Sequence, residues 1–261
     1  MKSRMRGRKH TEASRLLRIL RVVGFLVLLH SCTLGTAQMI FQGKMFVVIG
    51  GINATIGNPL NTITGCDAVL CADSCLWNGN CRVFSLETRP TTTVCQLGSN
   101  GSTIIKNPTG MSAAFYYDRN TVPPGYTFAM ITDKMHFLKP FTVFMNYTTG
   151  LAACKADGAN HLVQDDKGLT WHNFILQYAA SNFAAPGTFW LGGDDLDRNH
   201  IYNWNDGTLV SASVQTFWES RQPDNSGPCI QLHWYHSGFH DLWDDFFCSQ
   251  LFGVLCEVRL P

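Results

Sequence analysis

The residues best suited to chemistry are four oxygen-bearing side chains near the C-terminal end of the chain. Gln222 and Asp224 flank Pro223, and Asp244 and Asp245 come from a later segment that is expected to form a neighbouring strand. Calcium in proteins takes about six to eight oxygen ligands, drawn from carboxylates, amide carbonyls and water. Gln222, Asp224, Asp244 and Asp245 are therefore candidate ligands for a calcium ion.

Three further carboxylates, Asp194, Asp195 and Asp197, are candidates for a second calcium ion, although acidic loop residues are more often simply solvated. The chain contains no Gly-x-Ser-x-Gly elbow, phosphate-binding loop or dinucleotide fingerprint. The carboxylates between residues 222 and 245 resemble metal ligands more than the acid and base of a glycosidase. We therefore expect a binding protein and not an enzyme.

A histidine-rich segment offers residue types that ligate zinc, namely His233, His236 and His240 with Asp241. The segment is expected to run from a strand into a loop, so these side chains do not share one helical face. No glutamate follows at the spacing of a catalytic zinc centre. We favour histidines on a surface loop over a zinc-dependent catalytic site.

The first 37 residues hold 8 of the 20 Lys and Arg and one acid, which leaves 12 basic against 18 acidic residues, a formal charge of −6. Such a product lacks the basic face of a nucleic-acid binder. The basic start, the apolar run 22–29 and the small residues before Gln38 predict a secretory signal peptide over 1–37. The alternative is an uncleaved anchor in a membrane, although the run falls short of the roughly 20 residues needed to span a bilayer.

Cysteine usage also indicates an oxidising compartment. Ten cysteines are present, and Cys32 belongs to the predicted signal peptide. The nine that remain should mostly be paired, with the odd one free or bonded to another chain. Sequons at Asn53, Asn100 and Asn146 suit a glycosylated product. We expect a secreted, extracellular glycoprotein.

Cysteine spacing divides the chain into two parts. Five cysteines lie between residues 66 and 95, and the next is Cys154. Between these groups, Pro-Pro-Gly within 118–125 predicts a non-helical, extended linker.

Residues 43–117 resemble a PAN/apple domain. The resemblance lies in Cys71-x3-Cys75-x5-Cys81, the expected strand 83–86 and Cys95. Cys71 and Cys75 are one helical turn apart, so their thiols face one side of a short helix. The resemblance implies the disulfides Cys71–Cys95 and Cys75–Cys81. It leaves Cys66 unpaired, as a free thiol or an intermolecular one, and the alternative is an unrelated small disulfide-rich domain.

Residues 126–258 resemble a C-type lectin domain over their whole length. Residues 149–159 are typical of its first helix, and residues 169–183 carry an i, i+3, i+4, i+7, i+8 apolar stripe that predicts a second helix. Residues 189–193 stand where the family has a core strand. The other matching motifs are, in order, Trp204-Asn-Asp-Gly, Gln222-Pro-Asp, Leu242-Trp-Asp-Asp and Leu255-Cys-Glu.

The lectin resemblance implies an α+β fold with two helices, two small antiparallel sheets and a long loop region that carries the site. It also implies the disulfides Cys154–Cys256 and Cys229–Cys248 and a cis peptide bond before Pro223. In the family, the calcium ion contacts two neighbouring sugar hydroxyls, and the order Gln-Pro-Asp resembles the galactose and N-acetylgalactosamine pattern. The implied function is calcium-dependent binding of glycans or glycoproteins.

Three departures from the family pattern weaken the expectation of a calcium-dependent, galactose-type site, and the alternative is a calcium-independent protein-interaction module for adhesion or the matrix. Gly227 stands where the family has a metal-binding glutamate. Asp244 replaces an asparagine and, when ionised, has no hydrogen to donate to a sugar oxygen. No aromatic residue lies in 225–228 to stack on a sugar face, although Trp234 or Tyr235 are candidates to replace it. With either ligand, Cys66 offers a route to a disulfide-linked dimer and so to multivalent binding.

Overall fold

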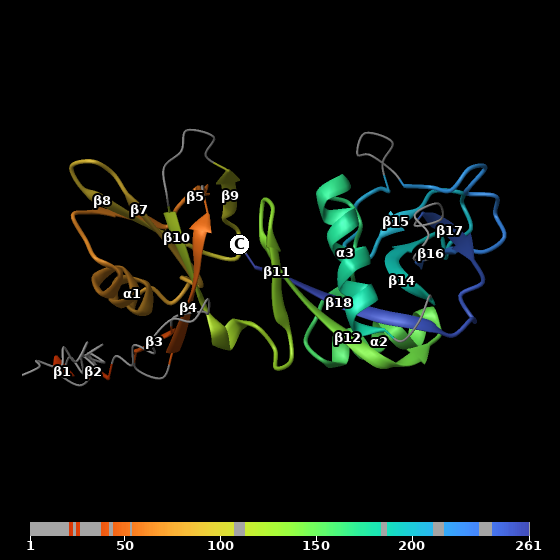
Figure 1. Cartoon of the computed structure of the whole chain (residues 1–261), viewed down its shortest axis with the longest axis horizontal. Coiled ribbons are helices and arrows are strands. Elements are labelled where there is room, and N and C mark those ends of the chain that lie inside the picture. The colour runs from red at the N-terminus through yellow and green to blue at the C-terminus, as the bar shows by residue number, and fades with distance from the viewer. Residues whose placement is uncertain are drawn as a thin grey trace, which may run out of the picture.

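The computed structural model describes residues 21–22, 25–26, 38–41, 44–52, 54–106, 113–183, 187–210, 217–234 and 242–260. Most of the predicted signal peptide lies outside these ranges, as do Asn53, Tyr235, His236, His240 and Asp241. No helix within the described ranges combines the length and apolar character needed to cross a membrane. The elements form two lobes, one from each half of the chain (Figure 1).

The N-terminal lobe is built on a six-stranded sheet with the order β3-β4-β10-β7-β8-β6. Strand β10 alternates buried Ala113, Phe115 and Tyr117 with less buried neighbours, because successive side chains of a strand point to opposite faces. A separate pair, β5 and β9, lies in the same lobe. The bounds are β1 (Arg21–Val22), β2 (Phe25–Leu26), β3 (Gln38–Phe41), β4 (Lys44–Ile52), β5 (Ala54–Gly57), β6 (Asn61–Thr64), α1 (Ala68–Trp77), β7 (Val83–Thr88), β8 (Thr93–Gly98), β9 (Thr103–Lys106) and β10 (Ala113–Asp118).

Helix α1 is fixed to this sheet by disulfides. It begins after Asp67, whose carboxylate accepts a hydrogen bond of 2.8 Å from a main-chain N–H of the first turn. Cys71 of α1 bonds to Cys95 of β8, and Cys75, one turn later, bonds to Cys81. All four cysteines are fully buried in one small core, so the disulfides form part of the packing in this lobe.

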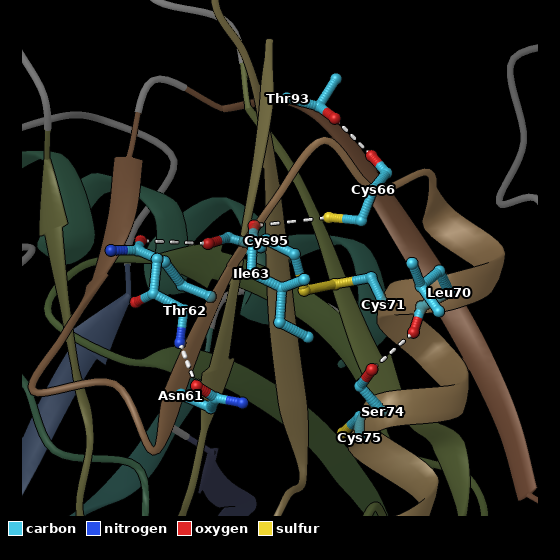
Figure 2. The surroundings of a disulfide bond; sticks show 12 residues. Asn61, Thr62, Ile63, Cys66, Leu70, Cys71, Ser74, Cys75, Thr93 and Cys95 are labelled. Atoms are coloured by element: carbon cyan, nitrogen blue, oxygen red, sulfur yellow. Dashed lines mark hydrogen bonds between the residues drawn. A yellow bond between two sulfur atoms is a disulfide. The ribbon is translucent and has the colours of Figure 1, made fainter.

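Cys66 is a free thiol and is only 3% exposed. Figure 2 shows its sulfur directed at the main-chain oxygen of Ile63, 3.5 Å away, while its own carbonyl accepts a hydrogen bond from the Thr93 hydroxyl. A thiol buried in this way is not presented to a second chain. The structure therefore offers no support for the predicted disulfide-linked dimer.

The C-terminal lobe contains an eight-stranded sheet that follows the path β11-β12-β18-β14-β16-β17, with β13 beside β18 and β15 beside β14. Strands β14 and β18 pair in parallel and so join all of these strands into one sheet. The lectin resemblance had implied two small sheets. The bounds are η1 (Arg119–Thr121), β11 (Thr127–Ile131), β12 (Met135–Met145), α2 (Tyr147–Ala156), β13 (His161–Leu162), α3 (Leu169–Asn182), β14 (Gly187–Asp194), β15 (Asn203–Trp204), β16 (Cys229–Trp234), β17 (Trp243–Phe246) and β18 (Phe252–Leu260).

The two helices of this lobe, α2 and α3, cover its sheet (Figure 1). The face of α3 that contacts the core includes Trp171, Ile175 and Ala179, all at 0% exposure, in agreement with the apolar stripe of the sequence. Two disulfides join distant segments, one from Cys154 of α2 to Cys256 of β18 and one from Cys229 of β16 to Cys248. The second closes the segment that contains β17 and its two aspartates, Asp244 and Asp245.

One hydrophobic cluster spans the two lobes. A single cluster of buried side chains includes Phe115 and Tyr117 of the first lobe and Phe137 of the second. The rings of Tyr117 and Phe137 lie 4.9 Å apart, and the Ile104 main-chain N–H donates to the Asp133 carbonyl at 2.6 Å. The predicted linker 118–125 starts with the short 3-10 helix η1, so it is not extended throughout.

A buried glutamate ties β18 to the rest of the C-terminal lobe. Glu257 is fully buried, and its carboxylate lies 2.6 Å from His136 Nδ1, 3.1 Å from Arg259 Nε and 3.4 Å from Lys167 Nζ. Burial raises the pKa of Glu257, but Lys167, Arg259 and His136 outweigh burial and hold it well below its ordinary value. The ionised carboxylate therefore stabilises the folded lobe.

Candidate functional site

The candidate site is organised around Asp245 of β17, whose side chain is completely buried. Its Oδ1 accepts a hydrogen bond from the Asp224 main-chain N–H at 2.8 Å, and its Oδ2 accepts one from the Gly227 main-chain N–H at 3.3 Å. The Ser226 hydroxyl donates to the Asp245 main-chain oxygen. The Asp245 carboxylate thus holds the loop 222–227 through two main-chain hydrogen bonds.

The loop brings Gln222 and Asp224 next to Asp245. The Gln222–Pro223 peptide bond is cis, and Gln222 Oε1 accepts a hydrogen bond from the Asp224 main-chain N–H at 2.9 Å. Gln222 Oε1 and Asp245 Oδ1 therefore lie within hydrogen-bond distance of the same nitrogen atom. Asp224 is exposed, and its Oδ1 accepts from the Ser226 main-chain N–H at 2.9 Å. Three of the four predicted ligands come together here.

The fourth predicted ligand, Asp244, contacts different partners. Adjacent residues of a strand point to opposite faces, and Asp244 lies directly across from Gln231 of β16. Its Oδ2 accepts a hydrogen bond from the Gln231 amide at 2.7 Å and lies 3.4 Å from His233 Nε2. Gln231 is not among the predicted ligands, and no signal in the sequence marks it as a partner of Asp244.

The residues of the loop do not complete a calcium cage of the family type. A Cβ atom on Gly227 would lie 2.0 Å from the Phe246 carbonyl carbon and 2.1 Å from its oxygen, so the main chain leaves no room for a side chain at the place of the family's glutamate. Together with the position of Asp244, this leaves fewer oxygen ligands than the roughly six to eight that calcium takes. Within the described ranges, no three acidic, histidine or cysteine side chains lie close enough to hold a metal together.

The three aspartates suggested for a second calcium ion also have separate partners. Asp194 Oδ2 accepts from the Tyr147 hydroxyl at 2.7 Å and from the Asn205 amide at 3.2 Å. Asp195 is buried and accepts main-chain hydrogen bonds at 2.9 and 3.2 Å from residues 199 and 200, whereas Asp197 accepts one from the Asn199 side-chain amide at 2.8 Å. Each of these carboxylates organises the loop after β14.

A buried acid outside the predicted site fixes the start of β17. Asp165 Oδ2 accepts hydrogen bonds from the Trp243 indole N–H at 2.8 Å and from His172 Nδ1 at 2.5 Å. Burial raises the pKa of Asp165, and the hydrogen bond from His172 opposes that effect. Trp243 immediately precedes the two aspartates of β17, so these contacts position the strand. The sequence showed Asp165 only as one more acid in a connecting segment.

Backbone strain is concentrated around the loop. Of the five described non-glycine residues with positive φ, four lie here: Arg198, His200, Arg221 and Asn225. Such conformations cost about 1 kcal/mol or more each, and they collect at functional sites. His200 Nδ1 lies 2.9 Å from Asn225 Oδ1, so the loop after β14 and the loop 222–227 meet at the surface. The result is an exposed surface of amide, imidazole and carboxylate groups.

Two of the sequon residues belong to the described part of the chain. Asn100 is exposed in a turn next to β9, and Asn146 is half-buried, with Oδ1 capping α2 through the Thr149 main-chain N–H at 2.8 Å. Nδ2, the atom that would carry a glycan, is not the capping atom of Asn146. Neither position conflicts with glycosylation, which stays a prediction.

Comparison with known proteins places the C-terminal lobe. Residues 144–258 match the family model of the lectin C-type domain. The chain is 34% identical over 97 residues to "C-type lectin domain family 4 member M" of Hylobates lar, a match that covers 37% of this chain and 23% of that protein. It is 34% identical over 94 residues to "Hepatic lectin" of Gallus gallus, covering 33% of this chain and 42% of that protein.

Among solved structures, the carbohydrate-recognition domain of the mouse scavenger receptor C-type lectin aligns with a TM-score of 0.42 and 21% identity, over 53% of this chain and 97% of that one. The family match starts at residue 144 and leaves residues 43–117 outside its bounds. The PAN/apple resemblance of the N-terminal lobe therefore stays a prediction.

Proposed function

Because the C-terminal half of the chain is a C-type lectin domain, we propose that the protein binds carbohydrate through the surface formed by the loop 222–227 and the loop after β14. C-type lectins are a family of binding proteins and not of enzymes, and no catalytic step is proposed. The observation that carries the proposal is the buried Asp245, which holds the exposed Asp224 and its neighbours in a fixed arrangement.

The recognition that this geometry supports is direct hydrogen bonding. The exposed Asp224 supplies a carboxylate acceptor, the Gln222 amide supplies two donors, and Asn225 and His200 add further polar groups. Adjacent sugar hydroxyls both donate and accept, so mixed donors and acceptors held in place suit them. Exposed Leu196 and Ile201 offer apolar contacts beside these groups. This recognition does not use calcium, because the residues present do not complete a calcium ligand set.

Calcium-dependent binding with a galactose-type preference is the second candidate. It is favoured by the order Gln222-Pro223-Asp224 and by the close approach of Gln222 Oε1 and Asp245 Oδ1 to one nitrogen atom. This reading requires Asp244 to leave Gln231 and turn toward the loop. A calcium-independent protein-interaction module is the third, and it is favoured by Gly227.

One experiment separates the three. The full-length chain is applied to immobilised galactose and to a glycan array, each with calcium and with excess chelator. Retention that survives chelation supports direct recognition, elution by chelator supports the calcium-dependent alternative, and no retention on any glycan supports protein binding.

A matched pair of variants locates the surface. Asp224→Asn keeps the main-chain donor and the acceptor for Ser226 but removes the charge, so it should weaken glycan retention by about tenfold or more, as expected for a hydrogen bond to a charged group. Asp133→Asn alters an exposed aspartate on the β11–β12 turn and should leave retention unchanged. Equal retention by both variants would place the sugar surface elsewhere.

We also propose that the chain is secreted after cleavage near residue 37 and is N-glycosylated. The basic and apolar start, the disulfides and the sequons support this. N-terminal sequencing of the mature product, and a mass shift on enzymatic removal of N-glycans, test the two statements separately. A membrane-bound product that retains residues 1–37 would favour the anchor instead.

A further inference from the structure

The cluster formed by Gln231, His233 and Asp244 is a second polar centre, separate from the loop 222–227. Gln231 and His233 lie two residues apart on β16 and therefore on one face, and Asp244 of β17 lies across from Gln231 on the same face. Gln231 is fully buried, and the side chains of His233 and Asp244 are 24% and 12% exposed. The cluster is thus buried at Gln231 and reaches solvent at His233.

The atoms of the cluster have the separations of metal ligands. His233 Nε2 lies 3.4 Å from Asp244 Oδ2, and the Gln231 amide nitrogen lies 3.0 Å from the first and 2.7 Å from the second. Bonds of about 2.0–2.2 Å to a tetrahedral zinc ion place its ligands roughly 3.3 Å apart. An imidazole nitrogen and a carboxylate oxygen are therefore already at the right spacing.

Among the residues that the structure describes, two buried oxygen atoms of the cluster have no hydrogen-bond partner. They are Gln231 Oε1 and Asp244 Oδ1. Buried polar atoms are nearly always satisfied, so two such atoms on directly opposed residues need an explanation. Rotation of the Gln231 amide by half a turn exchanges its nitrogen and oxygen and directs Oε1 toward His233 and Asp244. A cation between the three side chains would then be a partner for Gln231 Oε1 and would contact the Asp244 carboxylate through Oδ2.

The second ring nitrogen of His233 has a partner that suits metal binding. With Nε2 as a ligand, Nδ1 carries the proton and can donate to the Thr188 hydroxyl of β14, 3.2 Å away. Metal-binding histidines characteristically donate their second ring nitrogen in this way. Strand β14 thus supplies the hydroxyl that orients the histidine, β16 supplies Gln231 and His233, and β17 supplies Asp244.

From this geometry we propose that Gln231, His233 and Asp244 form a zinc-binding site, with His233 Nε2, Asp244 Oδ2 and Gln231 Oε1 as ligands and a solvent molecule in the fourth position. An imidazole ligand favours zinc and similar transition metals over calcium, which takes oxygen ligands. The site does not depend on carbohydrate binding, and it gives Asp244 a role other than the calcium ligation that the sequence suggested.

Zinc binding is measured by isothermal titration of the full-length chain, prepared without a polyhistidine tag and with its disulfides formed. We expect one zinc ion per chain, displaced by chelator and not by millimolar calcium. His233→Gln and Asp244→Asn should each weaken binding at least about tenfold, Thr188→Val should weaken it by a similar factor, and Asp133→Asn should have no effect. Thermal unfolding in chelator shows whether each variant folds.

The proposal fails if the chain binds no zinc, or if either His233→Gln or Asp244→Asn, once shown to fold, binds zinc as tightly as the unaltered chain. A second measurement covers variants that fail to fold. A crystal of the unaltered chain soaked in zinc should give an anomalous peak about 2.0–2.1 Å from His233 Nε2. A zinc peak only at other residues would overturn the assignment as well.

Discussion

The packing of Gly227 on Phe246 predicts that any side chain at position 227 destabilises the domain. In Gly227→Ala the added Cβ would meet the Phe246 carbonyl carbon at 2.0 Å, where contact normally requires about 3.5 Å. Main-chain atoms cannot rotate away as the end of a side chain can, so the loop 222–227 must shift as a whole. Overpacking of this kind costs about 1–3 kcal/mol.

The shift would also break two hydrogen bonds. The Gly227 main-chain N–H donates to Asp245 Oδ2 at 3.3 Å, and its carbonyl accepts from the Tyr202 hydroxyl at 3.1 Å. At about 1 kcal/mol each, the two bonds bring the expected loss to roughly 3–5 kcal/mol of the free energy of unfolding. For a chain of this size, that corresponds to a fall in Tm of roughly 6–20 °C.

Denaturant and thermal unfolding of Gly227→Ala and Gly79→Ala provide the assay. Gly79 has no heavy atom within 4 Å of its added Cβ, so its variant measures the effect of replacing glycine without a clash. A loss below about 1 kcal/mol for Gly227→Ala relative to this control would refute the packing argument. It would show that the loop moves at little cost.

Gly227→Glu extends the test to calcium. The variant restores the family's metal-binding residue in sequence, but the structure leaves no space for it, so calcium should not stabilise the variant. A site filled at 100 times its Kd would raise the free energy of unfolding by about 2.7 kcal/mol, which thermal unfolding detects readily. A calcium-dependent rise in Tm for this variant would contradict the claim that position 227 has no room for a ligand.

Three further predictions concern stability. Because the folded-state pKa of Glu257 is depressed, its stabilising effect should be present above the unfolded pKa of about 4.3 and lost as the pH falls below that value. In urea unfolding, Glu257→Gln should therefore lose less of its free energy of unfolding in acid than the unaltered chain does. Replacing Cys154 and Cys256 by serine opens a bond between residues 102 apart and should cost about 4–5 kcal/mol, measured by the same method, whereas a loss under 2 kcal/mol would mean that the unfolded chain is restrained by other means. Cys66 should react with a thiol reagent only after unfolding, and the chain should run as a monomer on non-reducing gels; rapid labelling of the folded chain or a reducible dimer would contradict its burial.

The sequence alone determined features that depend on neighbouring residues. The apolar stripe of 169–183 specified α3 and its buried face, because side chains three and four residues apart lie on one side of a helix. The spacing of one helical turn between Cys71 and Cys75 placed both thiols on one face of α1 for the same reason. The motifs in residues 126–258 follow the order of the lectin domain, and their agreement with the family at many positions was sufficient to predict the lectin fold.

Contacts between distant segments were decided only by the tertiary structure. Alternation along β17 shows that Asp244 and Asp245 face opposite ways, but only the pairing of β16 with β17 places Asp244 beside Gln231 and His233 and Asp245 beneath the loop 222–227. The sequence shows a glycine at 227, and only the fold shows that Phe246 fills the space a side chain would need. The hydrophobic cluster that spans the two lobes was likewise not predictable from the sequence. Each of these features depends on the register and packing of residues far apart in the chain, which local periodicity does not encode.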